Sequence, residues 1–294
     1  RLPLTNQSPK NTNVKNHLRC IYVNSRSAAK RGAIDALHNY LTAQDVDCAF
    51  LAETWFSDSI RDAELSQRGR FNVYRRDRQS RGGGVCILTR KSLVTLEVGC
   101  DHPGEFIAVD LLGDDQRLRV ACFYLTNSGD ACARALRTVE CVSAITKLCS
   151  VDWPAVIVGD FNLPSINWSH VEQLPISSKE MTFVDGCDSN GLVQLVNFPT
   201  HSSGNTLDLL LVSNPELVDR LFHADPSVPS DHHVIGFDLI YNTTPYFPPR
   251  TPLNFRKMNC IAIAEYLDAV NWRSLFSSCR NVNDMYLEFV DCCT

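Results

Sequence analysis

The stretch VIVGDFNLPSINW, residues 156–168, carries two polar side chains directly after an apolar run. Its first three residues are small and apolar and predict a buried β-strand that ends near Gly159. A carboxylate follows at Asp160 and a carboxamide at Asn162. Side chains two residues apart on an extended backbone point to the same side. We therefore expect Asp160 and Asn162 to act on one ligand.

The composition of the 294-residue chain limits its size class and its partners. Apolar residues make up 44% of the sequence, enough for a sizeable core. At about 150 residues per domain, the length allows one large domain or two small ones. The net charge of −5 gives no global attraction to nucleic acid, so DNA binding needs a local basic patch. No apolar run approaches the roughly 20 residues that span a bilayer.

The 13 cysteines include no pair at C-x-x-C spacing, which argues against a zinc site. Their odd number, without the spacing of a disulfide framework, favours a reducing compartment. Four of them, Cys20, Cys48, Cys86 and Cys122, lie in apolar strand-like runs. Cysteine acts there as a small hydrophobic residue.

Short apolar runs separated by turn residues predict many strands, with a few helices between them. This pattern predicts an α/β fold, a four-layer sandwich in which two packed, mainly antiparallel β-sheets are flanked by helices. The predicted strands are 18–23, 47–53, 71–76, 83–90, 106–112, 118–125, 154–160, 206–213 and 234–240, and the predicted helices are 31–43, 131–150 and 178–190.

Three regions follow from composition. Residues 1–17 are polar and form a predicted disordered lead-in. Residues 18–242 form the predicted α/β domain. Residues 243–294 begin with a proline-rich linker, which cannot continue a central strand, and go on as a helical connector. The first residue is Arg1 and the last residues are DCCT, so we expect a piece of a longer polypeptide.

Polar residues recur at the ends of the predicted strands. Each one alone is common in turns and at surfaces. Asp208 differs because it interrupts an apolar run, and a buried carboxylate needs a partner, for which His232 is a candidate. If the strand ends align, these side chains meet at one rim: Asn24, Glu53, Asp160, Asn162, Asp208, Asp231 and His232.

The order of these motifs resembles the endonuclease/exonuclease/phosphatase superfamily, the group of deoxyribonuclease I and the abasic-site endonucleases. It is most similar to the endonuclease domain of non-LTR (LINE-type) retrotransposon polyproteins. The resemblance covers about residues 18–240, and the segment from 254 onward looks like the connector to a reverse transcriptase. The matching motifs are N-x-R-S at 24–27, ETW at 53–55, RGGGV at 81–85, GDFNLPSINW at 159–168, TLDLLLVS at 206–213 and SDHH at 230–233.

This resemblance implies a metal-dependent endonuclease that nicks DNA by phosphodiester hydrolysis. Mg²⁺ prefers one or two carboxylates together with water and phosphate oxygens. The resemblance implies that Glu53 binds Mg²⁺, with Asn24 and Asp231 as direct or water-mediated contacts, and that Mn²⁺ can substitute. In the retrotransposon setting the freed 3′-hydroxyl primes reverse transcription.

The resemblance also assigns roles in the reaction. Asp160 would orient or deprotonate the attacking water, and Asn162 would donate its amide to a phosphate oxygen. His232 would bind the phosphate, and Asp208 would hold the imidazole in its charged form. Tyr124 would offer its hydroxyl to the same phosphate.

Contact with DNA is expected from a basic hairpin and two hydroxyl groups. The segment YRRDRQSR, residues 74–81, reads either as a solvated hairpin or as a clamp on phosphates. The expected partners are double-stranded target DNA, the element RNA and a reverse transcriptase domain, with action in the nucleus after synthesis in the cytoplasm. The residues expected to contact DNA are Arg75, Arg76, Arg78, Arg81, Thr200 and Ser230.

Two other functions stay open at this point. The same fold could act as an abasic-site endonuclease or as a phosphatase on lipid or inositol phosphates. It could also be an inactive nucleic-acid-binding module. A target-DNA nuclease would nick undamaged plasmid, whereas an abasic-site endonuclease or a phosphatase would not. An inactive binding module would bind nucleic acid without turnover, and Asp160→Asn would not change its behaviour.

Overall fold

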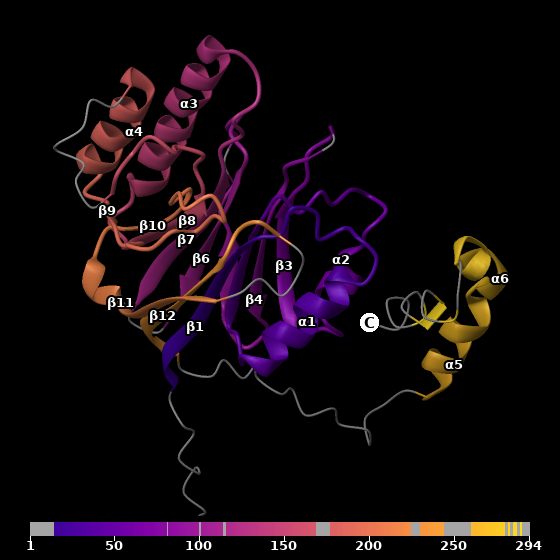
Figure 1. Cartoon of the computed structure of the whole chain (residues 1–294). Coiled ribbons are helices and arrows are strands. Elements are labelled where there is room, and N and C mark those ends of the chain that lie inside the picture. Colours follow the sequence, from indigo (N-terminus) through magenta and orange to yellow (C-terminus); the bar gives the residue numbers. More distant parts are fainter. Residues whose placement is uncertain are drawn as a thin grey trace, which may run out of the picture. The chain divides into compact units, whose positions relative to one another are not determined.

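A computed structural model describes residues 15–80, 82–99, 101–113, 116–168, 177–224, 230–243 and 260–279, together with residues 282, 285, 286 and 289. The chain divides into two compact units, Arg1–Tyr246 and Phe247–Thr294. The larger unit contains two six-stranded sheets (Figure 1).

The first sheet has the strand order β11-β12-β1-β2-β4-β3. Strands β1 and β2 at its centre run parallel, and the other neighbours are antiparallel. β1 begins at Lys15, three residues before the predicted start of this strand. The bounds are β1 Lys15–Asn24, β2 Cys48–Ala52, β3 Phe71–Arg76, β4 Val85–Arg90, β11 Val218–Ala224 and β12 Val234–Thr243.

The second sheet has the order β5-β6-β7-β8-β10-β9 and also contains one central parallel pair, β7–β8. Its other neighbours are antiparallel. The bounds are β5 Thr95–Glu97, β6 Phe106–Leu112, β7 Arg117–Tyr124, β8 Ala155–Asp160, β9 Val193–Gln194 and β10 Asp208–Val212.

Helices cover the outer face of each sheet. Apolar residues of α1 (Ala33–Ala43) and α2 (Asp62–Leu65) pack on the first sheet. Those of α3 (Ala131–Cys149) and α4 (Ser178–Ser189) pack on the second (Figure 1). The resulting order is helices, sheet, sheet, helices, which confirms the predicted four-layer sandwich. A short 3₁₀ helix, Pro215–Leu217, precedes β11.

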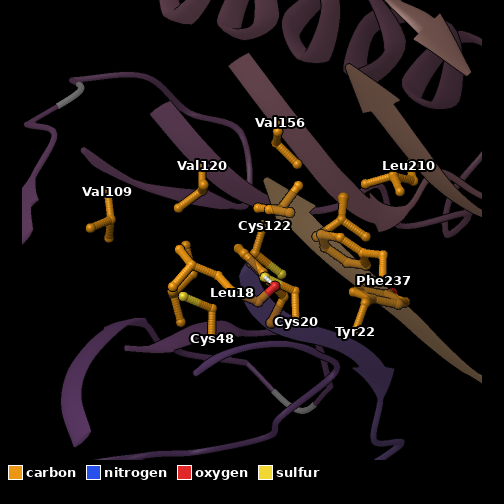
Figure 2. Close-up of a cluster of buried hydrophobic side chains, with 14 of the residues drawn as sticks. Leu18, Cys20, Tyr22, Cys48, Val109, Val120, Cys122, Val156, Leu210 and Phe237 are labelled. Atoms are coloured by element: carbon orange, nitrogen blue, oxygen red, sulfur yellow. Dashed lines mark hydrogen bonds between the residues drawn. The ribbon is translucent and has the colours of Figure 1, made fainter. Parts of the chain in front are cut away.

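The core between the sheets is built from alternate residues of the central strands, because side chains alternate between the two faces of a strand. Figure 2 shows Cys20 and Cys48 of the first sheet meeting Val120 and Cys122 of the second. All four of the cysteines singled out above are buried and free, which confirms their packing role. Burial raises the pKa of the Cys122 thiol well above its usual range, so it packs as a neutral thiol.

Four short or exposed elements have no clear sequence signal. β5 and β9 are three and two residues long, and α2 has four residues. β11 is an edge strand whose residues are exposed or only half-buried, so it lacks an apolar pattern. The three strands among them are determined by their neighbours in the sheets more than by local β-preference.

The smaller unit contains α5 (Cys260–Ala269), α6 (Trp272–Leu275) and a 3₁₀ turn, Phe276–Ser278. The predicted helical connector thus contains helices within its described residues. The predicted lead-in falls outside the described residues up to position 14, and most of the proline-rich linker does so too. No helix in the described part of the chain has the length and apolarity that crossing a bilayer requires.

Candidate active site

The strand order brings polar strand ends together at one edge of the sandwich. The carboxyl ends of the two parallel pairs carry Asn24 and Glu53 on the first sheet, and Tyr124 and Asp160 on the second. Parallel strands end on the same side of a sheet, so each pair presents two such residues side by side.

Two antiparallel neighbours begin where these pairs end. Asp208, the first residue of β10, lies directly opposite Asp160 of β8. His232 stands two residues before β12, which runs antiparallel to β1. We call the six residues Asn24, Glu53, Tyr124, Asp160, Asp208 and His232 the polar edge.

Three hydrogen bonds at the polar edge cross from one sheet to the other. His232 Nδ1 lies 2.7 Å from Asp208 Oδ2. The Tyr22 hydroxyl donates to Asp208 Oδ1 at 2.9 Å. Asn24 Nδ2 donates to Asp160 Oδ2 at 2.9 Å. Neither sheet alone carries this set of contacts.

Asn24 is the centre of the arrangement. Its Nδ2 also donates to Glu53 Oε1 at 3.2 Å and lies 3.4 Å from His232 Nε2. Glu53, Asp160 and His232 therefore surround one amide nitrogen, although 179 residues separate the first from the last in the chain (53 to 232). The expectation that these three side chains meet is confirmed.

Burial and like charge perturb the acids and the histidine. Burial raises the pKa of Asp160 well above its usual range, and the facing Asp208 adds to the rise. Burial by itself lowers the pKa of His232, but the hydrogen bond to Asp208 and the nearby carboxylates outweigh it and raise the value to about 9. His232 is therefore an imidazolium at neutral pH, and Asp160 is a more basic carboxylate than usual.

Tyr124 lies beside these acids. It pairs in register with Asp160 across the parallel β7–β8 ladder. Burial raises the pKa of its phenol, and the negative charges of Glu53 and Asp160 raise it further. The hydroxyl therefore keeps its proton and can donate it in a hydrogen bond.

The local reason for the Gly-Asp-Phe-Asn sequence differs from the predicted one. A Cβ on Gly159 would lie 2.3 Å from the carbonyl oxygen of Phe123, so only glycine fits the close approach of β8 to β7. The strand ends at Asp160, and Asn162 has a left-handed φ of 49°. The prediction that Asp160 and Asn162 point the same way from an extended backbone was therefore wrong. The pair is joined instead by a bond from Asn162 N to Asp160 Oδ1 at 3.0 Å.

Asp231 lies next to the polar edge, and the contacts of its carboxylate decide whether it could bind a metal ion. Its Oδ1 is buried and has no hydrogen-bond partner among the described residues. Its Oδ2 is close to Arg26 and His201. Burial alone would raise the pKa of Asp231, but the positive charge of Arg26 lowers it overall, so it is ionised.

These donors fit a hard divalent cation. The carboxylates of Glu53 and Asp231 are the ligand type that Mg²⁺ prefers. The buried Oδ1 of Asp231 has no hydrogen-bond partner in the described part of the chain. Asn24 fits less directly, because its Oδ1 accepts from Arg26 N at 3.2 Å while Nδ2 faces the carboxylates. Coordination by Asn24 would require its amide to turn over. Ion binding by Glu53, Asn24 and Asp231 stays a prediction.

Thr200 and Ser230 were expected to contact DNA, and the structure gives both another task. Thr200 is fully buried, and its Oγ1 accepts the backbone N–H groups of Leu207 and Asp208, each at 3.0 Å. Since a fully buried hydroxyl does not reach DNA, the expectation for Thr200 was wrong. Ser230 Oγ donates to Asn24 O at 2.7 Å and so fixes the strand end that carries Asn24.

The described arginines of the hairpin bind groups of the protein itself. Arg75 pairs with Asp62 at 3.2 Å and Asp77 at 3.3 Å. Arg76 Nη2 donates to His102 O at 2.7 Å. Arg78 lies 3.6 Å from Glu105. Arg81 falls outside the described residues. These contacts offset the positive charge, and a role in DNA binding stays a prediction.

The sequence alone predicts no role for three residues at this edge: Tyr22, Arg26 and His201. Tyr22 precedes Asn24 by two residues on β1, so the strand period could have placed it on the same face. Arg26 belongs to the N-x-R-S motif but received no role. His201 carries no local signal, because only tertiary pairing with residue 232 brings it in.

Backbone strain is concentrated at the same edge. Five of the eight described non-glycine residues with positive φ lie in its loops: Arg26, Ser27, Glu53, Trp55 and Asn162. Each such conformation costs of order 1–3 kcal/mol, and packing must enforce it. For example, Ser27 N donates to the carbonyl of Glu53 at 2.8 Å, which holds two of these loops together.

The layered fold and this cluster of acids with a histidine define an α/β-sandwich phosphodiesterase. The model of the Endonuclease/Exonuclease/phosphatase family matches residues 11–232, and the chain belongs to this family. Enzymes of this family typically use a divalent metal. None of the curated proteins matches the chain.

Solved structures with the same fold include nucleases and a phosphatase at low identity. The endonuclease domain of TRAS1, a telomere-specific non-LTR retrotransposon, is 13% identical, with a TM-score of 0.57 over 76% of this chain and 98% of that one. An AP endonuclease from Archaeoglobus fulgidus is 16% identical, with a TM-score of 0.58 over 75% and 98%. The 3′ phosphatase NExo from Neisseria, bound to a product DNA hairpin, is 17% identical, with a TM-score of 0.61 over 76% and 100%.

Proposed function

We propose that this protein is a divalent-metal-dependent endonuclease that nicks target DNA and leaves a 3′-hydroxyl to prime reverse transcription in retrotransposition. The observation that carries the proposal is the meeting of Glu53, Asp160 and His232 around Asn24 Nδ2. A base, a cation-binding carboxylate and an imidazolium then lie within reach of a single phosphate.

Each side chain has a distinct part in hydrolysis. Asp160 accepts the proton of the attacking water, and its raised pKa makes it a better base near neutral pH. The His232 imidazolium and the Tyr124 hydroxyl donate to the phosphate where negative charge develops. Asn162 Nδ2 donates one hydrogen to Leu125 O at 3.0 Å and directs the second to the phosphate. A Mg²⁺ ion held by Glu53, when bound, would stabilise the anionic centre and the leaving oxygen.

The retrotransposon setting rests on the sequence motifs, with ETW at 53–55 and DFNLPSINW at 160–168 as the most specific. In this setting the partners are double-stranded DNA, the element RNA and a reverse transcriptase domain, and the site of action is the nucleus. The TRAS1 domain supports the shared fold at an identity that carries no more than the fold.

A plasmid assay tests the proposal. Purified wild-type protein with Mg²⁺ is expected to convert supercoiled plasmid to the nicked circle, and EDTA is expected to stop it. Asp160→Asn and His232→Ala are expected to lower the rate by at least about 10³-fold, because each removes a proton-transfer or charge-stabilising group. Thermal unfolding of each variant serves as the control for folding.

The substrate class is separated in the same experiment with a duplex that contains one abasic site. Cleavage of the abasic duplex without nicking of undamaged plasmid would replace the proposal with abasic-site repair. Equal nicking by wild type and Asp160→Asn would reject Asp160 as the base. Binding of DNA with no turnover by the wild type would reject the enzyme altogether.

A further inference from the structure

Asp231 lies between two basic side chains that the proposed reaction does not use. Arg26 Nη1 forms a close ion pair with Asp231 Oδ2. His201 Nε2 lies 3.4 Å from the same oxygen. The other oxygen, Oδ1, is buried and has no hydrogen-bond partner in the described part of the chain. Both basic groups thus share one oxygen and leave the second one open.

The hydrogen bonds of His201 fix the position of its ring proton. The backbone N–H of Ser203 donates to His201 Nδ1 at 3.0 Å, so Nδ1 is an acceptor. The ring proton therefore sits on Nε2, the nitrogen that faces Asp231. In this state the Nε2–H group faces Asp231 Oδ2 at 3.4 Å, and Nε2 has no lone pair for a metal.

His201 also contacts the segment that carries His232. The two imidazole rings meet edge to face, with centroids 4.7 Å apart and an interplanar angle of 82°. Backbone bonds join the same two segments: Ser202 N donates to Asp231 O, and His233 N donates to Thr200 O, each at 2.8 Å. His201 therefore touches both the carboxylate and the imidazole that follows it.

Arg26 belongs to the loop that follows β1. Its backbone N–H donates to Asn24 Oδ1 at 3.2 Å, which turns Asn24 Nδ2 toward the carboxylates of the polar edge. Its φ of 39° is left-handed, a strained conformation for arginine. The Arg26 side chain extends to Asp231 and forms the ion pair with Oδ2.

The solvent exposure of these groups argues against a purely structural role. The Arg26 side chain is 56% exposed and that of Asp231 is 30% exposed. Ion pairs in such positions contribute little to stability, because water and salt screen them. A strained backbone that supports a weakly stabilising pair is better explained by a requirement for geometry.

We propose that Arg26 and His201 are positioning residues of the nuclease, which act through Asp231. They hold Oδ2 from two sides, keep Oδ1 open, and fix the segment that places His232 against Asp208. This inference rests on the proposed function, because its main readout is the nicking rate.

A double-mutant cycle tests whether the two residues act through Asp231. His201→Ala and Arg26→Ala are each expected to lower kcat for nicking by about 10–100-fold, the usual effect of removing such a supporting contact, with little change in KM. In an Asp231→Asn background, the same substitutions are expected to have almost no further effect, since their target has lost its charge.

Two variants of His201 test its N–H donor and its aromatic ring separately. His201→Gln keeps an N–H donor and is expected to recover most of the rate. His201→Phe keeps the edge-to-face ring contact with His232 and is expected to behave like His201→Ala. The matched control is His17→Ala, which removes a histidine–aspartate pair of similar length, 3.5 Å to Asp219, on exposed residues away from the polar edge. It is expected to nick like the wild type.

Additive effects of His201→Ala and Asp231→Asn on kcat would overturn the proposal, and so would full activity of His201→Phe. Loss of rate in the His17→Ala control would also overturn it, because removal of any such pair would then suffice. The proposed function fails in a different way, through absence of nicking by the wild type. In that case the cycle is measured on the NMR chemical shift of the His232 imidazole, where additive changes from Arg26→Ala and Asp231→Asn would contradict coupling through Asp231.

Discussion

Two buried ionic clusters lie at opposite ends of β7, and they differ in how their charges are matched. At its start, Arg119 donates to both oxygens of Asp110, at 2.7 and 2.9 Å, and to Leu148 O at 3.1 Å. At its end, two buried carboxylates, Asp160 and Asp208, face one histidine. The first cluster is satisfied within the protein, and the second carries excess negative charge that a cation or a proton must offset.

The backbones of the two clusters differ in the same direction. Arg119 and Asp110 lie within regular strands and pair in register. The polar edge lies at strand ends, and the loops that follow those strands contain five positive-φ residues. Matched charge within regular strands indicates a structural role, and unmatched charge beside strained loops indicates a functional one.

Replacing Asp110 or Asp160 with asparagine is expected to give the largest effects. Asp110→Asn breaks a buried bidentate pair and is expected to lower the free energy of unfolding by about 3–5 kcal/mol. Its nicking rate is expected to stay near that of the wild type, because Arg119 lies roughly 17 Å along the strand from Tyr124. Asp160→Asn is expected to do the reverse, with at least about 10³-fold less nicking and unchanged stability.

Urea unfolding and plasmid nicking on both variants measure this exchange, at a temperature where Asp110→Asn is still folded. Loss of nicking by folded Asp110→Asn would break the comparison. A large loss of stability in Asp160→Asn would break it as well, since Asp160 would then be a structural acid.

The second prediction concerns the pH dependence of stability. The folded pKa of His232, about 9, lies above its ordinary value of 6.5. The imidazolium therefore contributes stability that is fully present below pH 6.5 and is lost as the pH rises through 9. Asp208→Asn removes the hydrogen bond and charge that raise this pKa. Urea unfolding without metal is expected to show a fall of about 2–3 kcal/mol between pH 6.5 and 9 in the wild type, and much less in the variant. Parallel curves would show that Asp208 does not hold the charge.

The smallest predicted effect comes from backbone strain. Ser27 has a φ of 87°, a region that glycine occupies at no steric cost. Ser27→Gly is expected to raise the free energy of unfolding by about 1 kcal/mol through relief of this strain. Ala33→Gly, in the first turn of α1, is the control and is expected to be destabilising. A less stable Ser27→Gly variant would show that the serine side chain outweighs the strain.

The sequence predicted the buried strands and the long helices because their apolar periodicity is strong. For example, the run 206–213 contains β10, and 131–150 contains α3. It also predicted that Glu53, Asp160 and His232 would meet, since each one ends or precedes such a strand. Edge strand β11 was missed because its residues are not buried.

The errors at the site have a common physical cause. The burial of Thr200 and the left-handed backbone of Asn162 depend on loop packing, which leaves no periodic signal. The contact between His201 and Asp231 depends on a bridge between segments 31 residues apart (201 to 232). Strand ends can be located from a sequence, whereas loop conformations between them require the tertiary structure.

The three bonds that join Tyr22, Asn24 and His232 to Asp160 and Asp208 all cross the interface between the sheets. Because these bonds cross the interface, neither sheet carries the complete polar edge before the two sheets dock. Catalytic competence arises only at docking, when both half-sites meet in register. On the proposed function, return of nicking during refolding is then expected to report the association of the two sheets.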